Sequence, residues 1–389
     1  MSRTELMEFL AVATDGSPVE QLRQALNDIY EQLRAAGGIA ADFTAMTWSA
    51  ARPGAFHPSR REIDLAYREV FGGFRPPISL EIGEGHLTVR ARAVIEPLLD
   101  QQPLWRQWNF TELERQMSPR SAAVSMRDVF AEKRKQGAAF RARHPHAAYD
   151  IAYGPGRNET FDLFYPAQGG VRPLWIFIHG GYWQASDKSD VHDLAAQMLK
   201  AGYAVAMPNY DLCAPATLRT VVEQMRRCMT FLLGNAGSLG LDPAQINIAG
   251  TSAGGHLAAL LVCDSELAFI RSTLAISGLL HLEPVAMLPA GRILGLDPET
   301  TRKLSPALQM PNPGVKVGVA VGEMESEEFR RQSSELAKQW NATFLEVKGR
   351  RHFDVTTDLS TGGPLADLAL ELASVPAARS KVAASSSQR

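Results

Sequence analysis

The sequence contains little cysteine and no cysteine pattern that is typical of metal binding. Its 389 residues include three cysteines, Cys213, Cys228 and Cys263, and no CxxC pair. A small, odd number of cysteines argues against a disulfide framework and against a zinc site, and is typical of reduced thiols in the cytoplasm. We therefore expect a cytoplasmic protein with no metal and no organic cofactor.

The sequence also lacks an excess of charge and a long apolar run. Its 42 acidic and 40 basic residues give a net charge of −2. The N-terminal residues MSRTELMEF have no apolar segment of the kind found in signal peptides. Apolar runs such as residues 257–263 are far shorter than the roughly 20 residues that a membrane helix needs. We expect neither a nucleic acid nor a membrane as a partner.

From residue 99 onward, strand-like segments alternate with helical ones. Residues 174–178 (LWIFI) form a continuous apolar run, as in a strand that is buried on both faces. Further strands are expected at 150–153, 160–165, 203–208, 246–249, 272–277, 316–321 and 343–347, and helices at 190–200, 217–233 and 254–263. This alternation predicts an α/β fold with a mostly parallel sheet, whose ligand sites lie at the carboxyl ends of the strands.

The N-terminal part has a different pattern. Helices are expected at 18–36 and 60–70, and strands at 43–49, 78–82 and 87–95. This order predicts two helices packed against an antiparallel sheet, an α+β domain. We divide the chain into an α+β domain (1–98), an α/β domain (99–376) and a disordered tail (377–389), because the tail is small, polar and without periodicity.

A GxSxG motif, GTSAG, occupies residues 250–254 between the strand INIA and the helix GGHLAALLVC. In a nucleophile elbow the serine lies on a strained turn between strand and helix, and the flanking glycines let the neighbouring backbone approach. The alternative is a glycine-rich turn whose serine only caps the helix. The strand and helix on either side favour Ser252 as a nucleophile.

A second motif, HGGYW, follows the buried strand LWIFI directly. Two glycines at such a position can present backbone N–H groups to an oxyanion, together with the N–H of the residue after the nucleophile. We therefore expect the amides of Gly180, Gly181 and Ala253 to form an oxyanion hole. His179 precedes the serine, so we expect it to be a structural residue of the loop.

In enzymes with a nucleophile elbow of this kind, the general base follows the nucleophile in the sequence. Three histidines do so. His256 lies on the helix after the serine, His281 comes before the strand KVGVAV that leads to the expected acid, and His352 follows the last strand. We therefore expect His352 to be the base. The acid follows the strand KVGVAV, where spacing leaves Glu323 and Glu325 as alternatives.

These motifs resemble the kynurenine formamidase (arylformamidase) family of the α/β-hydrolase fold. The resemblance rests on HGGYW, GTSAGGH and the stretch ESEEFRRQS followed by HF, and extends over residues 108–373. The family's acid is an aspartate in a D-S-P-E-F-like stretch, which here reads ESEEF and points to Glu325. The resemblance thus implies a Ser252–His352–Glu325 triad.

The same resemblance implies an enzyme that hydrolyses an aryl formamide such as N-formylkynurenine. Tyr182 and Trp183 are expected to line an aromatic substrate site, although both could instead pack beneath the loop. Arg351 could bind a substrate carboxylate, whereas the other basic clusters, including residues 133–135, are expected to be solvated helix faces. The alternative activity is that of a carboxylesterase with the same triad. A catalytically inactive binding module is disfavoured because serine, histidine and glycine loop are all present.

The N-terminal domain resembles the RidA/YjgF family of imine deaminases over residues 5–97. The resemblance rests on EQLRQALNDIYEQLRAAGG, REIDLAYREVFGGFRPP and LTVRARAVI. The family's substrate-binding arginine is replaced by Ile78 after the proline pair, and its last-strand glutamate is absent. We therefore expect a non-catalytic module, and a homo-oligomer, dimer or trimer, because RidA-like proteins self-associate.

Overall fold

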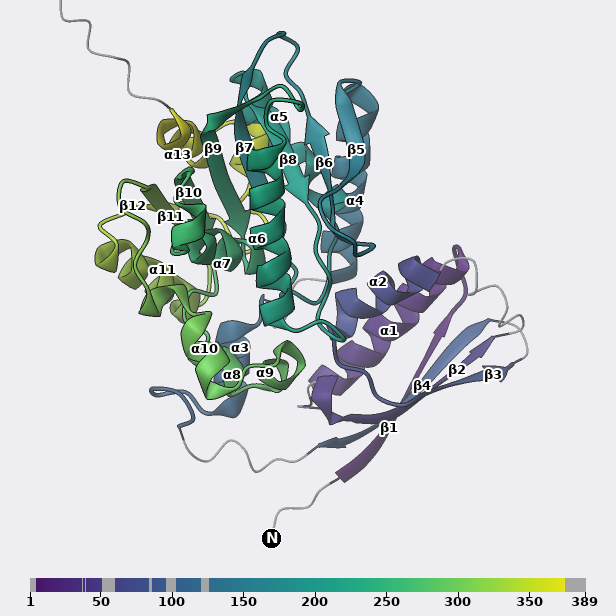
Figure 1. Ribbon diagram of the computed structural model, residues 1–389. Coiled ribbons are helices and arrows are strands. Elements are labelled where there is room, and N and C mark those ends of the chain that lie inside the picture. Colours follow the sequence, from purple (N-terminus) through teal and green to yellow (C-terminus); the bar gives the residue numbers. More distant parts are fainter. Residues whose placement is uncertain are drawn as a thin grey trace, which may run out of the picture.

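Two separate β-sheets organise the chain, one of four strands and one of eight (Figure 1). The computed structural model describes residues 5–36, 38, 40–50, 60–83, 86–95, 103–119 and 126–374. The predicted domain boundary at residue 98 and the predicted disordered tail at 377–389 both lie outside these ranges.

The eight-stranded sheet has the order β12-β11-β10-β9-β7-β8-β6-β5. Its six strands from β12 to β8 pair in parallel, whereas β6 pairs antiparallel with both β8 and β5. The mostly parallel sheet predicted from the sequence is thus confirmed. Its strands are β5 (Ala147–Ala152), β6 (Thr160–Phe164), β7 (Arg172–Ile178), β8 (Ala204–Pro208), β9 (Leu241–Thr251), β10 (Ile270–Ile276), β11 (Lys316–Gly322) and β12 (Thr343–Val347).

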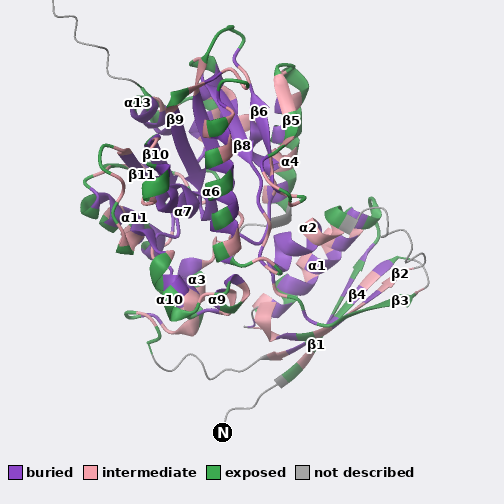
Figure 2. Cartoon of the chain, in the orientation of Figure 1, coloured by how far each residue is buried: buried purple, intermediate pink, exposed green. Residues whose placement is uncertain are grey.

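Both faces of this sheet are covered by helices, which explains the continuous apolar runs in its strands. In β7, alternate side chains join two different apolar clusters: Leu174, Ile176 and Ile178 lie in one, Trp175 and Phe177 in the other. The first cluster includes α6 (Leu218–Gly234), α7 (Ala253–Leu261) and α11 (Glu327–Gln339). The second includes α4 (Met126–Arg143), α5 (Ala196–Lys200), α12 (Thr357–Thr361) and α13 (Pro364–Ala373). Figure 2 shows the resulting buried interior in purple.

Several shorter helices lie together at one end of the large sheet (Figure 1). They are α3 (Phe110–Met117), α8 (Glu283–Ala286), α9 (Pro289–Leu294) and α10 (Pro298–Lys303). The helix predicted at 190–200 is split, since Lys188–Ala195 forms a 3-10 helix that continues into α5. An Asp187 capping box begins this segment and satisfies its first amides.

The four-stranded sheet has the order β1-β4-β2-β3. Its strands are β1 (Glu5–Ala13), β2 (Phe43–Ala50), β3 (Ile78–Ile82) and β4 (Leu87–Ile95), with helices α1 (Pro18–Ala35) and α2 (Arg60–Phe71). The prediction of an antiparallel sheet is wrong for one pair, because β2 and β3 run parallel. The helix α2 lies between them in the sequence and provides the crossover that a parallel pair requires. The strand β1 was not predicted.

The helices α1 and α2 lie between the small sheet and the larger part of the protein (Figure 1). Their buried side chains pack with those of β1, β2 and β4 into a separate apolar cluster. The opposite face of this sheet is exposed in the structure, including Leu6, Leu10 and Val12 of β1 (Figure 2). The expected homo-oligomer stays a prediction.

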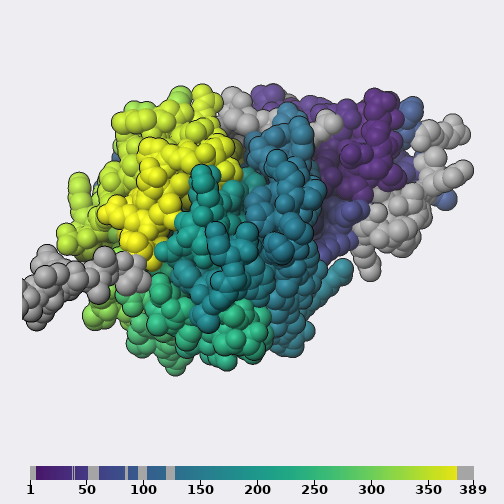
Figure 3. All heavy atoms as spheres, turned by 90° about the horizontal axis from the view of Figure 1, so that it is seen from above, coloured from purple at the N-terminus to yellow at the C-terminus, as the bar shows by residue number. Residues whose placement is uncertain are grey.

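Buried polar contacts join the two parts of the chain. The guanidinium of Arg68, on α2, is only 5% exposed and donates to the carbonyl oxygens of Cys213 at 2.7 Å and Ala214 at 2.5 Å. The neighbouring Glu69 accepts a hydrogen bond from Arg134 of α4 at 2.5 Å. Figure 3 shows the N-terminal part, in purple, lying directly against the blue segment that follows it.

None of the helices in the described ranges combines the length and the apolar character needed to span a lipid bilayer.

Candidate active site

Ser252 lies on the turn between β9 and α7 and has an unusual backbone conformation. Its φ of +56° and ψ of −119° fall outside the regions that side-chain-bearing residues ordinarily adopt. A Cβ on Gly250 would lie 2.2 Å from the carbonyl oxygen of Gly254, and a Cβ on Gly254 would lie 2.0 Å from that of Ile178. The two glycines of the motif are therefore required by the close approach of β9, α7 and β7.

His352 makes hydrogen bonds from both of its ring nitrogens. Its Nε2 lies 3.0 Å from Oγ of Ser252, and its Nδ1 lies 2.6 Å from Oε2 of Glu325. Because an ionised carboxylate can only accept, the proton resides on Nδ1, which leaves Nε2 free to accept the serine proton. The three side chains come from the ends of β9 and β11 and from the loop after β12, as the expected chain order requires.

The structure distinguishes the two carboxylates that spacing left open. Glu325 is buried against His352, and its second oxygen accepts from Oγ of Ser277 at 2.5 Å and from the amide of Gly322 at 2.8 Å. Glu323 is directed elsewhere: it accepts from the amide of Gly349 and from Lys348 at 3.0 Å. The backbone hydrogen bond from Gly349 lowers the pKa of Glu323, and the hydrogen bond from Lys348 adds to this effect. Of the two, Glu325 contacts His352.

The other candidate histidines lie in structural positions. His179 is buried, stacks on Tyr210 with ring centroids 4.3 Å apart, and donates from Nε2 to Oδ1 of Asn209 at 2.9 Å. His256 bonds the carbonyl oxygen of Leu304 at 2.7 Å, and burial lowers its pKa to about 4. His281 packs edge-on against a tryptophan and lies 3.6 Å from a glutamate at the surface.

The glycine loop after β7 lies beside the nucleophile. A Cβ on Gly180 would lie 2.9 Å from the carbonyl oxygen of Thr251 and 3.1 Å from Cβ of Ser252. Gly181 has a φ of +106°, which favours glycine, and its carbonyl oxygen accepts from the amides of Gln184 and Ala185. Ala253 begins α7, so its amide is one of those that a helix leaves without an internal partner. Gly180 and Gly181 line the same cavity as Ser252, and Ala253 follows the serine directly, whereas an oxyanion hole formed by their amides stays a prediction.

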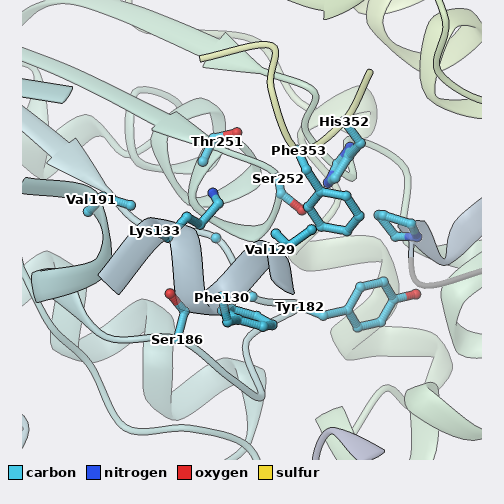
Figure 4. A pocket seen from close by; sticks show the side chains of 13 residues that line it. Val129, Phe130, Lys133, Tyr182, Ser186, Val191, Thr251, Ser252, His352 and Phe353 are labelled. Atoms are coloured by element: carbon cyan, nitrogen blue, oxygen red, sulfur yellow. The ribbon is translucent and has the colours of Figure 1, made fainter. Parts of the chain in front are cut away.

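A small cavity opens beside Ser252 and His352 (Figure 4). It has a volume of about 60 Å³, and Gly180, Gly181 and Tyr182 form part of its wall. The apolar side chains that line it are those of Pro119, Val129, Phe130, Val191 and Phe353, and the polar ones those of Lys133, Ser186 and Thr251. The prediction that residues 133–135 form a solvated face is wrong for Lys133, because α4 directs this lysine into the cavity.

The structure separates the two aromatic residues that were expected to bind substrate. Tyr182 lines the cavity, with a positive φ of 57°. Trp183 does not: it is 0% exposed, joins the main apolar cluster and packs edge-on against His256 at 4.9 Å. The expectation that Trp183 contacts substrate is corrected, because the turn at Tyr182 sends the next side chain beneath the loop.

Arg351 lies in a neighbouring hollow, not in the cavity beside Ser252. This hollow is also lined by Arg115 and Phe329, and it shares His352 and Phe353 with the cavity. The backbone amide of Arg351 donates to the carboxylate of Asp354 at 2.6 Å. A role for Arg351 in binding a carboxylate stays a prediction that applies to substrates reaching this hollow.

The sequence reasoning missed several residues of the site. Val129 and Lys133 are four residues apart on α4 and therefore share a helix face, which is the signal that would have paired them. Phe353 follows the predicted base directly, and Ser277 follows the end of β10. In the described part of the chain, no group of three or more His, Cys, Asp or Glu side chains is placed to hold a metal ion.

Comparison with known proteins supports this description of the fold. The BD-FAE family model matches residues 161–274, which include HGGYW and the serine motif. A crystal structure from Silicibacter sp. tm1040, provisionally assigned as a thioesterase, is 30% identical and superposes with a TM-score of 0.62. That match covers 68% of this chain and 99% of the other.

Curated proteins are also similar to part of this chain. Kynurenine formamidase of Salmo salar is 26% identical over 280 residues, covering 66% of this chain and 94% of that protein. Esterase LipQ of Mycobacterium tuberculosis is 32% identical over 132 residues, 31% of each chain. Together with the parallel sheet, the elbow and the hydrogen bonds of His352, these similarities show that the chain belongs to the α/β-hydrolase family.

Proposed function

We propose that the protein is a serine hydrolase that removes the formyl group from an aryl formamide such as N-formylkynurenine. Ser252 is the nucleophile, His352 the general base and acid, and Glu325 the group that orients His352. The observation that carries this proposal is the pair of hydrogen bonds made by His352, 3.0 Å to Ser252 and 2.6 Å to Glu325. Relatives named kynurenine formamidase support the choice of substrate class.

The first half of the reaction forms a formyl-enzyme. Oγ of Ser252 attacks the formyl carbon while Nε2 of His352 accepts its proton, and the oxyanion is bound by the amides of Gly180, Gly181 and Ala253. His352 then donates the proton to the aryl amine nitrogen as the C–N bond breaks. Glu325 stabilises the imidazolium that exists between these two transfers.

The second half releases the formyl group as formate. A water molecule attacks the ester carbon of the formyl-enzyme, and His352 accepts its proton. The tetrahedral intermediate collapses when His352 returns a proton to Oγ of Ser252. The formyl group would lie in the cavity beside Ser252, which Gly180 and Gly181 also line.

The second candidate is a carboxylesterase that uses the same triad. A specific observation favours it: a relative named esterase LipQ is 32% identical over the segment it shares with this chain. Both reactions pass through the same kind of acyl-enzyme, and they differ in whether the leaving group is an amine or an alcohol. The site contains the same proton donor, His352, for either.

Steady-state kinetics on an aryl formamide and on an ester distinguish the two. We expect N-formylkynurenine to be hydrolysed with a kcat/KM at least as high as that for p-nitrophenyl acetate. Turnover of the ester alone would leave the esterase function and exclude the formamidase. A fluorophosphonate should label Ser252 stoichiometrically in the wild type, and Ser252→Ala should abolish both labelling and turnover.

A further inference from the structure

Three adjacent basic residues on α4 have three different surroundings. Arg134 donates to Glu69 of α2 at 2.5 Å, and Lys135 lies 3.8 Å from Glu132 at the surface. Lys133 instead lines the cavity that contains Ser252. Figure 4 shows its side chain leaving α4 and placing its nitrogen on the side of the cavity where Thr251 and Ser252 lie.

No described side chain forms a direct salt bridge with the Lys133 ammonium group. Among the described residues, Lys133 makes no salt bridge and no hydrogen bond. It interacts electrostatically, without direct contact, with the carboxyl groups of Asp190 and Asp193. The Asp190 carboxyl is itself engaged by Oγ of Ser186 at 3.0 Å, and burial raises its pKa to about 6. Burial likewise raises the pKa of Asp193.

Apolar side chains form much of the cavity wall around Lys133. Val129, Phe130, Val191 and Phe353 line the same cavity, and burial lowers the pKa of the Lys133 ammonium group. An ammonium group in such a place costs free energy unless an anion is brought to it. The cavity therefore combines a nucleophile, two glycines of the HGGYW loop and a lysine ammonium group that makes no direct hydrogen bond with a described side chain.

We propose that Lys133 is a specificity-determining residue that selects substrates carrying a carboxylate close to the scissile carbonyl. The ammonium group binds the carboxylate by a charge-assisted hydrogen bond, while Ser252 attacks the carbonyl in the same cavity. This inference rests on the proposed serine hydrolase function and names the substrate class for it. The carboxylate can belong to the acyl part or to the leaving amine or alcohol.

The helix that carries Lys133 is joined to the N-terminal part of the chain. Glu69 of α2 is buried and accepts from Arg23 of α1 at 2.9 Å as well as from Arg134. Because Arg134 is the residue next to Lys133, this ion pair ties α2 to the segment of α4 that lines the cavity.

The test compares matched neutral and anionic substrates in the wild type, Lys133→Met and Lys135→Met. For the acyl part, the pair is p-nitrophenyl butyrate and the p-nitrophenyl monoester of succinate. For the leaving part, the pair is formanilide and N-formylanthranilate. Methionine keeps the length of the lysine chain and removes its charge, and Lys135→Met is the control for loss of charge on the same helix.

We expect Lys133→Met to lower kcat/KM for the anionic member of one pair by about 10- to 100-fold, the effect of losing a hydrogen bond to a charged group. The neutral member should change by less than about threefold, and Lys135→Met should leave both unchanged. The pair that responds shows which part of the substrate carries the carboxylate. Equal losses on both members, or no loss on either, would overturn the proposal.

Two further measurements keep this outcome interpretable. An unchanged rate of fluorophosphonate labelling at Ser252 shows that Lys133→Met is folded with an intact nucleophile. If formamides are not hydrolysed but succinate ester selectivity disappears in Lys133→Met, the formamidase function fails and the role of Lys133 stands. A wild type without preference for the anionic member of either pair refutes the role of Lys133 whatever its activity.

Discussion

The guanidinium of Arg68 spans two loops, donating to the carbonyl oxygens of Cys213 at 2.7 Å and of Gln184 at 3.3 Å. Gln184 directly follows the HGGYW motif, and the amide of Cys213 donates to the carbonyl oxygen of Trp183 at 2.8 Å. A residue of α2 thus holds the loop whose glycine amides lie beside Ser252. This contact gives the N-terminal part a structural role at the site that requires no chemistry of its own.

Replacement of Arg68 by methionine should weaken both folding and catalysis. The buried carbonyl oxygens would lose a charged donor, which costs about 2–4 kcal/mol of unfolding free energy. Because the oxyanion loop would be less well held, we expect kcat to fall about 10-fold with little change in KM. Urea unfolding and steady-state kinetics measure the two effects. Arg92→Met, which removes an exposed ion pair with Glu8 on the small sheet, should change neither, and equal effects in both variants would contradict this account.

Glu325 and Glu323 offer a matched pair of substitutions two residues apart. Glu325→Gln keeps the shape but removes the charge that stabilises the imidazolium, so kcat should fall by about 1,000- to 10,000-fold. Glu323→Gln should retain activity within about twofold, because its carboxylate bonds Lys348 and the amide of Gly349. The kcat of the two purified variants decides the matter. Similar losses in both would show that the acid has been misassigned.

The sequence was sufficient to predict that the side chains of Ser252 and His352 meet, because the place of each follows from chain order. Ser252 lies between a recognisable strand and a helix, and His352 comes after the last strand. The acid could not be chosen from spacing, since Glu323 and Glu325 occupy one loop and only its folded path directs one of them toward His352. The family resemblance made the choice that local physics left open.

Other features depend on tertiary contacts that no local pattern records. Alternation of apolar residues is the same in parallel and antiparallel strands, so the parallel pairing of β2 with β3 was not predictable from their residues. Likewise, the basic run at residues 133–135 has the composition of a solvated face. In the structure Arg134 of this run pairs with Glu69, which is 65 residues away in the sequence, and Lys133 lines the cavity.

Gly254 provides a steric test of the elbow. An added Cβ would lie 2.0 Å from the carbonyl oxygen of Ile178 and 2.6 Å from that of His179, both backbone atoms that must move. We expect Gly254→Ala to lose about 1–3 kcal/mol of stability and about 100-fold in kcat/KM, because the displaced segment leads into the oxyanion loop.

The control for Gly254→Ala is Gly234→Ala at the end of α6, where an added Cβ would meet no atom within 4 Å. This variant should keep full activity and be as stable as the wild type or slightly more so, since alanine reduces the entropy of the unfolded chain. Thermal unfolding and kinetics on both variants provide the comparison. A fully active Gly254→Ala would mean that the close approach of the strands is not needed.

His256 makes folding sensitive to acid. It is buried and bonds the carbonyl oxygen of Leu304 at 2.7 Å, and burial lowers its pKa from 6.5 to about 4. Because the unfolded chain binds a proton near pH 6.5 and the folded chain only near pH 4, stability is lost as the pH falls through this interval. Between pH 7 and pH 5 the wild type should lose about 2 kcal/mol more unfolding free energy than His256→Gln, which has no proton to take up. Urea unfolding of both proteins at the two pH values measures this difference, and parallel losses in the two would mean that His256 is not the group responsible.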